Sequence, residues 1–141
     1  MDVEDVVRRA ILSMESDAIV ASDKDGRIVF WNPGAERIFG YASAHAVGQS
    51  LDIIIPERLR KRHWNGYRYV MEGGDSRYGK GDLLAVPAIA SDGRNLSVEF
   101  TIVPLKSKAD DLMGFVAIMR DVTSRFEETR ELRRKLAEAS K

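Results

Sequence analysis

The stretch Asp25-Gly26-Arg27-Ile28-Val29-Phe30-Trp31-Asn32-Pro33-Gly34-Ala35 decides the fold of this 141-residue chain. It begins with an Asp-Gly turn signal between two short apolar, β-prone runs, residues 18–21 and 27–31, and that pattern predicts a β-hairpin. Asn32 and Pro33 follow the second run directly, as a helix N-cap with proline in the first turn does. The stretch therefore predicts strand, turn, strand and helix in close succession.

On either side of this stretch, hydrophobic periodicity predicts further helices. Apolar residues at helical spacing indicate an amphipathic helix over residues 2–14. Short helical turns are expected at 35–39 and within 42–55. A longer helix is expected from Glu57 to Met71, ended by two glycines.

The second half of the chain is predicted to be mostly strand. Residues 83–89 and 113–119 are apolar runs, and residues 96–102 alternate strictly between apolar and polar. Strict alternation predicts that one face of the sheet is buried and that the other is more polar. The last segment, residues 122–141, reads as a charged helix.

The composition excludes several classes of protein. Hydrophobic residues make up 44% and charged residues 31%, which fits one globular domain. Lys plus Arg and Asp plus Glu both total 22, so no net charge favours nucleic acid or an anionic membrane as a partner. There is no apolar run of membrane-spanning length, no basic signal-peptide start, and no cysteine for disulfides or thiolate chemistry. A cytoplasmic location is the default expectation.

These motifs, in this order, resemble a PAS domain over residues 15–123. Besides the opening stretch, the resemblance is carried by Phe39-Gly40-Tyr41, Val47-Gly48-Gln49, Ser91-Asp92-Gly93-Arg94 and Met119-Arg120-Asp121-Val122-Thr123. It implies an α+β PAS fold, in which a five-stranded antiparallel sheet has short helices over one face and encloses a small pocket. It also implies flanking helices, residues 1–14 and 124–141, that carry a signal to a downstream effector domain, a signalling protein or a second copy.

The segment Ile55–Tyr67 resembles the corresponding helix of the haem-binding oxygen-sensor PAS domains. In that resemblance His63 occupies the position of the haem iron ligand, and Tyr67 follows four residues later. Leu59, His63, Tyr67 and Val70 share one helical face, so we expect the imidazole to project into the pocket. A neutral imidazole nitrogen binds iron. The resemblance therefore implies haem b as a cofactor, with His63 as its metal ligand.

The same resemblance assigns further pocket positions on the sheet. Phe100, Ile102 and Ala117 match pocket-lining positions of the haem-binding relatives, although such residues are also ordinary core residues. Leu84 matches the position at which the oxygen-binding relatives have an arginine. Because leucine cannot donate a hydrogen bond to bound oxygen, the expected inputs are carbon monoxide, nitric oxide or a redox change. The absence of cysteine excludes light sensing through a flavin–cysteinyl adduct.

Two hypotheses of function remain open. The first is a sensor that binds haem or an unidentified small molecule. The second is a cofactor-free PAS module that acts in dimerisation or protein–protein interaction, with Phe100 and Tyr67 filling the pocket. The chain has no nucleophile triad, phosphate-binding glycine motif or metal-spaced cluster, so we expect no enzyme activity. Under either hypothesis, a homodimer through the N-terminal helix, the exit helix or both is predicted.

Overall fold

The computed structural model of this protein describes residues 1–74 and 85–140. The elements are α1 (Val3–Leu12), β1 (Ala18–Asp23), β2 (Ile28–Trp31), α2 (Pro33–Phe39), α3 (Ser43–Ala46), the 3-10 turns η1 (Leu51–Ile54) and η2 (Glu57–Leu59), α4 (Arg60–Met71), β3 (Ala85–Ile89), β4 (Asn95–Lys106), β5 (Leu112–Asp121) and α5 (Thr123–Ala139). The expected α+β architecture, with a five-stranded antiparallel sheet, is confirmed.

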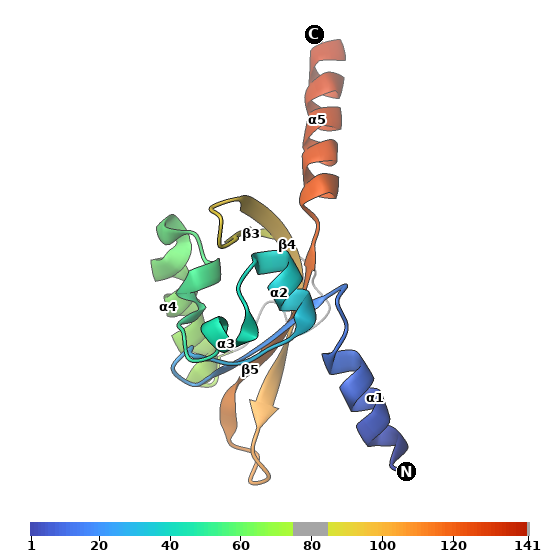
Figure 1. Cartoon of the computed structure of the whole chain (residues 1–141). Helices are drawn as coiled ribbons and strands as arrows, with labels where there is room; N and C mark the ends of the chain where they lie inside the picture. The colour runs from blue at the N-terminus through green and yellow to red at the C-terminus, as the bar shows by residue number, and fades with distance from the viewer. Residues whose placement is uncertain (75–84, 141) are drawn as a thin grey trace.

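The five strands form one sheet in the order β2-β1-β5-β4-β3, and every neighbouring pair is antiparallel. Strand β5 is therefore central, between β1 from the start of the chain and β4. The helices α2, α3 and α4 lie over one face of the sheet, here called the covered face (Figure 1). The helices α1 and α5 project away from this body at opposite ends.

The hydrophobic core lies between the covered face and the helices. Val20, Val98 and Met119, from three neighbouring strands, are buried in one cluster with Trp31 and Phe39. The rings of Trp31 and Phe39 lie 5.6 Å apart between centroids. Burying such large apolar side chains is the main favourable contribution to the stability of a domain of this size.

Asn32 is the polar residue at the centre of this arrangement, and it is 1% exposed. Its Oδ1 accepts hydrogen bonds from the backbone N–H groups of Ala35 (2.9 Å) and Ile19 (2.7 Å). Its Nδ2 donates to the carbonyl oxygens of Met14 and Asp17, both at 3.1 Å. The predicted N-cap is thus present, and the same side chain also ties α2 to β1 and to the residues before β1.

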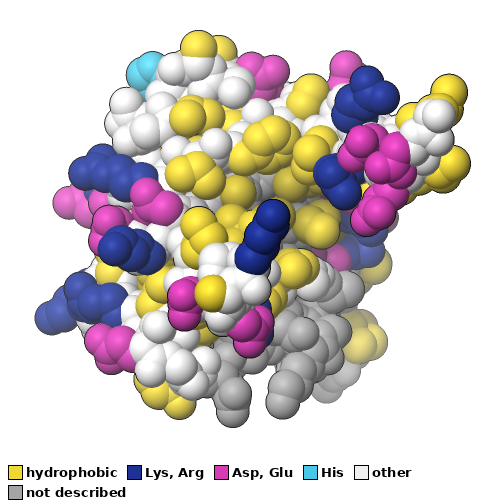
Figure 2. Space-filling model, turned by 90° about the horizontal axis from the view of Figure 1, so that it is seen from below, with side chains coloured by type: hydrophobic (Ala, Val, Ile, Leu, Met, Phe, Trp, Pro, Cys, Tyr) yellow, Lys and Arg dark blue, Asp and Glu magenta, His cyan; other side chains and the backbone are white. Residues whose placement is uncertain are grey.

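The opposite face of the sheet, here called the outer face, differs from the expected polar surface. Strand β4 does alternate at its start, where Glu99 and Thr101 face outward opposite Arg120 and Ile118 of β5. Beyond this point the alternation ends, and Val103 stays 44% exposed on the same face. Figure 2 shows hydrophobic side chains gathered in the middle of the surface that is seen from below.

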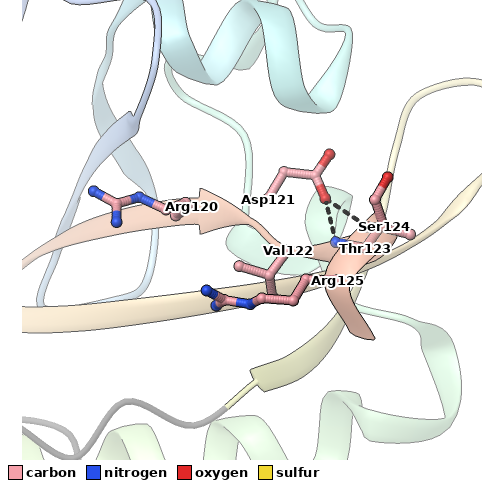
Figure 3. Close-up of a pocket in the computed structure, with 6 residues that line it drawn as sticks. All are labelled: Arg120, Asp121, Val122, Thr123, Ser124 and Arg125. Atoms are coloured by element: carbon pink, nitrogen blue, oxygen red, sulfur yellow. Dashed lines mark hydrogen bonds between the residues drawn. The ribbon is translucent and has the colours of Figure 1, made fainter. Parts of the chain in front are cut away.

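The exit from β5 into α5 is a short, hydrogen-bonded corner (Figure 3). The backbone N–H of Thr123 donates to the Asp121 carboxylate at 3.0 Å, and the Thr123 hydroxyl accepts from the backbone N–H of Ser97 at 3.0 Å. A cavity of about 310 Å³ opens between Arg120 and Arg125. The first turn of α5 is therefore held against the start of β4.

Candidate functional site

Helix α4 carries the candidate ligand, and it begins later than the sequence pattern predicts. The 3-10 turn Glu57–Leu59 comes first, because Leu59 has a backbone of φ −105° and ψ −4°, outside regular helical geometry. None of the residues of α4 is fully buried. The helix is thus a surface element whose position depends on a few contacts.

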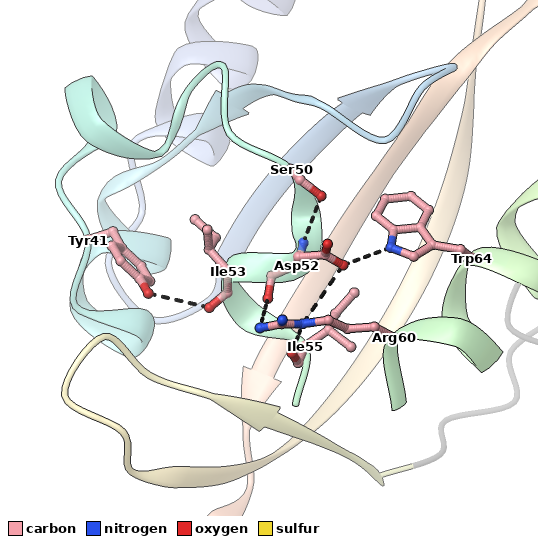
Figure 4. A network of polar contacts seen from close by, with 7 residues as sticks. All are labelled: Tyr41, Ser50, Asp52, Ile53, Ile55, Arg60 and Trp64. Atoms are coloured by element: carbon pink, nitrogen blue, oxygen red, sulfur yellow. Dashed lines mark hydrogen bonds and ion pairs between the residues drawn. The ribbon is translucent and has the colours of Figure 1, made fainter. Parts of the chain in front are cut away.

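The first of these contacts is a polar network around Asp52 (Figure 4). The indole Nε1 of Trp64 donates to the Asp52 carboxylate at 2.7 Å. The guanidinium of Arg60 donates to the carbonyl oxygens of Ile55 (3.1 Å) and Asp52 (3.3 Å). Arg60 and Trp64 therefore fasten two successive turns of the α4 region to η1.

The second contact is between Trp64 and the turn of the β1–β2 hairpin. Gly26 has φ +78°, and a Cβ atom added to it would lie 2.1 Å from the Trp64 ring. The indole therefore lies directly on the glycine backbone. A glycine is required at position 26 both by the left-handed conformation and by this ring.

The third contact is made by Tyr67, one turn further along α4. Its hydroxyl hydrogen-bonds to Ser22 Oγ at 3.0 Å and donates to the carbonyl oxygen of Asp23. Its ring meets Phe115 of β5 edge-on, with centroids 5.4 Å apart. Burial is the main cause that raises the pKa of Tyr67, so the hydroxyl stays protonated and able to donate. Tyr67 thus lies between α4 and the covered face.

His63 lies next to these two anchoring aromatics. Its ring centroid is 4.6 Å from that of Trp64 and 5.9 Å from that of Tyr67. The Nδ1 atom is buried and has no hydrogen-bond partner among residues 1–74 and 85–140. Burial lowers the pKa of His63 below 6.5, and the nearby Asp52 carboxylate opposes this in part. The imidazole is therefore neutral at physiological pH, the form that can donate a lone pair to a metal.

The sheet residues predicted to line the pocket share the covered face. Phe100 pairs with Met119 and Ile102 pairs with Ala117 across β4 and β5, and side chains of paired residues point to the same side of a sheet. Phe100 and Ala117 are partly buried against the core. Phe115, which Tyr67 contacts, lies two residues before Ala117 on the same face. Leu84 lies outside the described residues.

Sequence reasoning did not find the partners that hold α4 in place. Asp52, Ser22 and the hairpin glycine Gly26 all lie at least 12 residues from their α4 partners along the chain. Only one part of the site was predictable from a local pattern: the four-residue spacing of His63 and Tyr67, which places both on one face of the helix.

The described residues were also compared with the requirements of a metal site and of a membrane-spanning helix. Within residues 1–74 and 85–140, no group of three or more His, Cys, Asp or Glu side chains could hold a metal ion. In the same residues no helix is long and apolar enough to cross a membrane. A metal at His63 would therefore have to bring most of its own ligands, as haem iron does.

The comparison with protein families agrees with the architecture. The profile described as the PAS fold matches residues 14–127, so the chain belongs to the PAS family.

Relatives of the sensor class are similar over most of this chain. The oxygen sensor protein DosP of Escherichia coli K12 is 29% identical over 82% of the chain, which is 14% of DosP. The sensor protein FixL of Bradyrhizobium diazoefficiens is 31% identical over 82% of the chain, which is 22% of FixL. A blue-light photoreceptor of Listeria monocytogenes is 28% identical over 97% of the chain and 53% of its own length. The chain thus spans about half or less of these relatives.

Solved structures show the same fold at lower identity. A PAS domain from Colwellia psychrerythraea superposes with a TM-score of 0.73 at 24% identity, over 87% of this chain and 99% of the other. An RNA-binding light-oxygen-voltage receptor superposes with a TM-score of 0.75 at 23% identity, over 96% of this chain and 37% of the other. At these identities the likeness concerns the fold.

Proposed function

We propose that this PAS domain is a signal sensor that binds haem b through His63 and passes the change on through its flanking helices. The observation that carries the proposal is the buried Nδ1 atom of His63, which has no hydrogen-bond partner in the described part of the chain. A buried polar atom without a partner is rare in folded proteins and calls for a functional explanation.

The donor chemistry of the site fits haem. The imidazole is kept neutral by burial, and the macrocycle supplies the other nitrogen ligands, so a single histidine suffices. The segment around His63 resembles the ligand helix of haem-binding PAS domains, and two sensor relatives, one of them named an oxygen sensor, align with most of the chain. When bound, haem iron supplies a coordination position that responds to carbon monoxide, nitric oxide or a change of oxidation state.

The chain's own residues then have separate tasks. His63 holds the group to α4, while Phe100, Ile102 and Ala117 form the apolar wall on the covered face that keeps water away. The Trp64–Asp52 hydrogen bond, 2.7 Å long, fixes the part of α4 next to His63. Displacement of α4 reaches β5 through the contact between Tyr67 and Phe115. Strand β5 in turn runs into α5 through the corner at Thr123.

A specific contact favours the alternative, a cofactor-free module. The rings of Tyr67 and Phe115 pack edge to face with their centroids 5.4 Å apart. Tyr67 therefore fills space between α4 and the sheet that a macrocycle needs. Haem binding requires Tyr67 to leave this contact and its hydrogen bond to Ser22. If Tyr67 stays in place, the domain acts through dimerisation or a protein partner. In both cases we propose that it regulates an effector domain or signalling protein and has no enzyme activity of its own.

An absorption spectrum of protein expressed with haem available separates these two functions. We expect a strong Soret band in the wild type, its loss in His63→Ala, and its retention in His45→Ala. His45 is the matched control, because it is the other histidine of the chain and is stacked on Tyr41 at 5.5 Å, far from α4 in the sequence. A colourless wild-type protein that also fails to take up added haem overturns the haem proposal and leaves the cofactor-free module.

A further inference from the structure

Helix α4 has a second surface, which takes no part in the candidate site. One side of the helix carries the rings that contact the hairpin and the sheet. The other side, here called the solvent side of α4, consists of five exposed residues at helical spacing: Lys61, Arg62, Asn65, Arg68 and Tyr69. Helix α4 lies at the edge of the body, on the side away from α1 (Figure 1). The solvent side is therefore open to a partner from outside.

The charge of this part of the chain is positive and largely uncompensated. Residues 58–71 contain five basic residues and no acidic residue, in a chain that has 22 of each kind. Among the described residues, Arg60 alone of these five forms an ion pair, with Asp52 at 4.0 Å. The other four cations have no acidic partner within residues 1–74 and 85–140. A surface of this kind attracts carboxylates or other anions.

Gly66 leaves bare backbone in the middle of the solvent side. It lies inside α4, where glycine is less favourable than alanine. Its φ is not positive, and no atom of the described residues would lie within 4 Å of a Cβ there. Neither backbone conformation nor packing therefore requires a glycine at this position. Arg62 and Tyr69, one turn away on either side, are its neighbours on the helix surface, and Tyr69 is 61% exposed. Such a gap lets the backbone of a second helix approach closely.

The size of the solvent side favours a protein helix over a nucleic acid or a membrane. The helix has 12 residues and is about 18 Å long. Glu57 precedes it and Glu72 follows it, and both are exposed. A nucleic acid or an anionic bilayer extends past both ends and is repelled by these carboxylates. A short acidic helix is not, and its carboxylates reach Lys61, Arg62 and Arg68.

We propose that the solvent side of α4 docks an acidic helix of a protein partner, which crosses α4 at Gly66 and pairs its carboxylates with Lys61, Arg62 and Arg68. Because α4 also carries His63, docking and occupation of the pocket act on the same helix. The docking site is separate from the flanking helices and does not rest on haem binding. His63→Ala is expected to keep it, so the two proposals fail separately.

Titration of a fluorescein-labelled acidic peptide tests the contribution of charge. The probe is a helical peptide of about 20 residues, with glutamate along one face and alanine and glutamine elsewhere. Lys61→Glu is expected to weaken binding about tenfold or more, because it sets a carboxylate against carboxylates. Lys108→Glu is the matched control, since Lys108 is exposed in the turn between β4 and β5, and it is expected to bind like the wild type. A wild type that does not bind the peptide, or equal losses in the two variants, overturns the proposal.

Gly66→Leu tests the close approach at the glycine. Leucine is a good helix former and its Cβ meets no described atom within 4 Å, so the variant is expected to resist urea at least as well as the wild type. Binding of the same peptide is expected to weaken about tenfold or more, because the added side chain fills the space that the peptide backbone occupies. Unchanged binding would show that the partner does not cross α4 at Gly66, which contradicts the proposal.

Two other polyanions are titrated with the same pair of lysine variants. One is a single-stranded uridine RNA, and the other is a phosphatidylcholine vesicle that contains phosphatidylserine. We expect both to bind more weakly than the acidic peptide at the same salt concentration. If either binds more tightly, and Lys61→Glu abolishes this while Lys108→Glu does not, the solvent side of α4 is a nucleic-acid or membrane surface and the proposal is wrong.

Discussion

The His63 imidazole occupies a place that disfavours its protonated form. Burial outweighs the attraction of Asp52, so the pKa of His63 lies below 6.5 in the folded protein. At pH values between this lowered pKa and 6.5, His63 binds a proton more readily in the unfolded chain than in the folded one. The stabilising effect of neutral His63 is therefore fully present above pH 6.5 and is lost as the pH falls below it.

This gives a prediction for the protein without a bound cofactor. Urea unfolding just below pH 6.5 should show a lower free energy of unfolding than at neutral pH, and His63→Gln should reduce that difference. His45→Gln, which changes the exposed histidine, is expected to keep the wild-type dependence. If His63→Gln and the wild type lose stability equally on acidification, the group responsible is not His63.

The contacts of such residues can be predicted from the sequence only where their partners lie close along the chain. His63 and Tyr67 were expected on one helical face from their spacing of four, and their rings do lie 5.9 Å apart. The contacts of the Tyr67 hydroxyl with Ser22 and Asp23 cross more than 40 residues of chain. No periodic pattern encodes such a contact, because it depends on how α4 is placed against the finished sheet.

At the scale of elements, α4 is held on the domain by Trp64, Arg60 and Tyr67 rather than by a buried face. The contact of Trp64 with the hairpin turn can be tested at Gly26, because a Cβ there meets the ring at 2.1 Å. Gly26→Ala should destabilise the domain by about 3 kcal/mol, combining backbone strain and displacement of the ring.

Gly93→Ala is the matched control for this prediction. Gly93 has φ +88°, close to the +78° of Gly26, but no atom of the described residues would lie within 4 Å of a Cβ there. It should therefore cost only about 1 kcal/mol, the strain of the left-handed conformation. Thermal or urea unfolding measures both. If the two variants are equally stable, the indole does not lie on the hairpin turn.

Most element boundaries followed from local patterns, and the exceptions have a physical cause. The hairpin β1–β2 and the cap of α2 were expected from the Asp-Gly turn and from Asn32, which act locally. The split of the predicted 57–71 helix was not expected: Leu59 departs from α-helical dihedral angles, and Arg60, the next residue, donates to the Ile55 carbonyl at the end of η1. Alternation over residues 96–102 predicted a polar outer face, but Val103 and Ile118 make its other half apolar.

At the scale of the whole molecule, four charged side chains link the bases of the two flanking helices across the outer face. Arg120 of β5 donates to both carboxylate oxygens of Asp17, each at 3.2 Å. Glu99 of β4 pairs in register with Arg120 and accepts from Arg125 of α5 at 2.5 Å. Charges therefore alternate from the linker behind α1 to the first turn of α5. A shift of β5 relative to β4 changes both ends of this row together.

Glu99→Gln removes the carboxylate charge that pairs with Arg125 of α5. Because Arg125 is 64% exposed, the global stability should change by less than about 1 kcal/mol. Local opening of the first turn of α5 should become easier, so the Phe126 amide, which donates to the Val122 carbonyl at 2.8 Å, should exchange its hydrogen about fivefold faster.

Glu131→Gln separates this coupling from the stability of α5 itself. Glu131 pairs with Arg134 inside the helix, at 2.5 Å, and touches no strand in that pair. It should leave the exchange of the Phe126 amide unchanged, since the link between α5 and the sheet is intact. Equal exchange rates in both variants would mean that α5 is held by the Thr123 corner alone, and that the row of charges does not connect the sheet to α5.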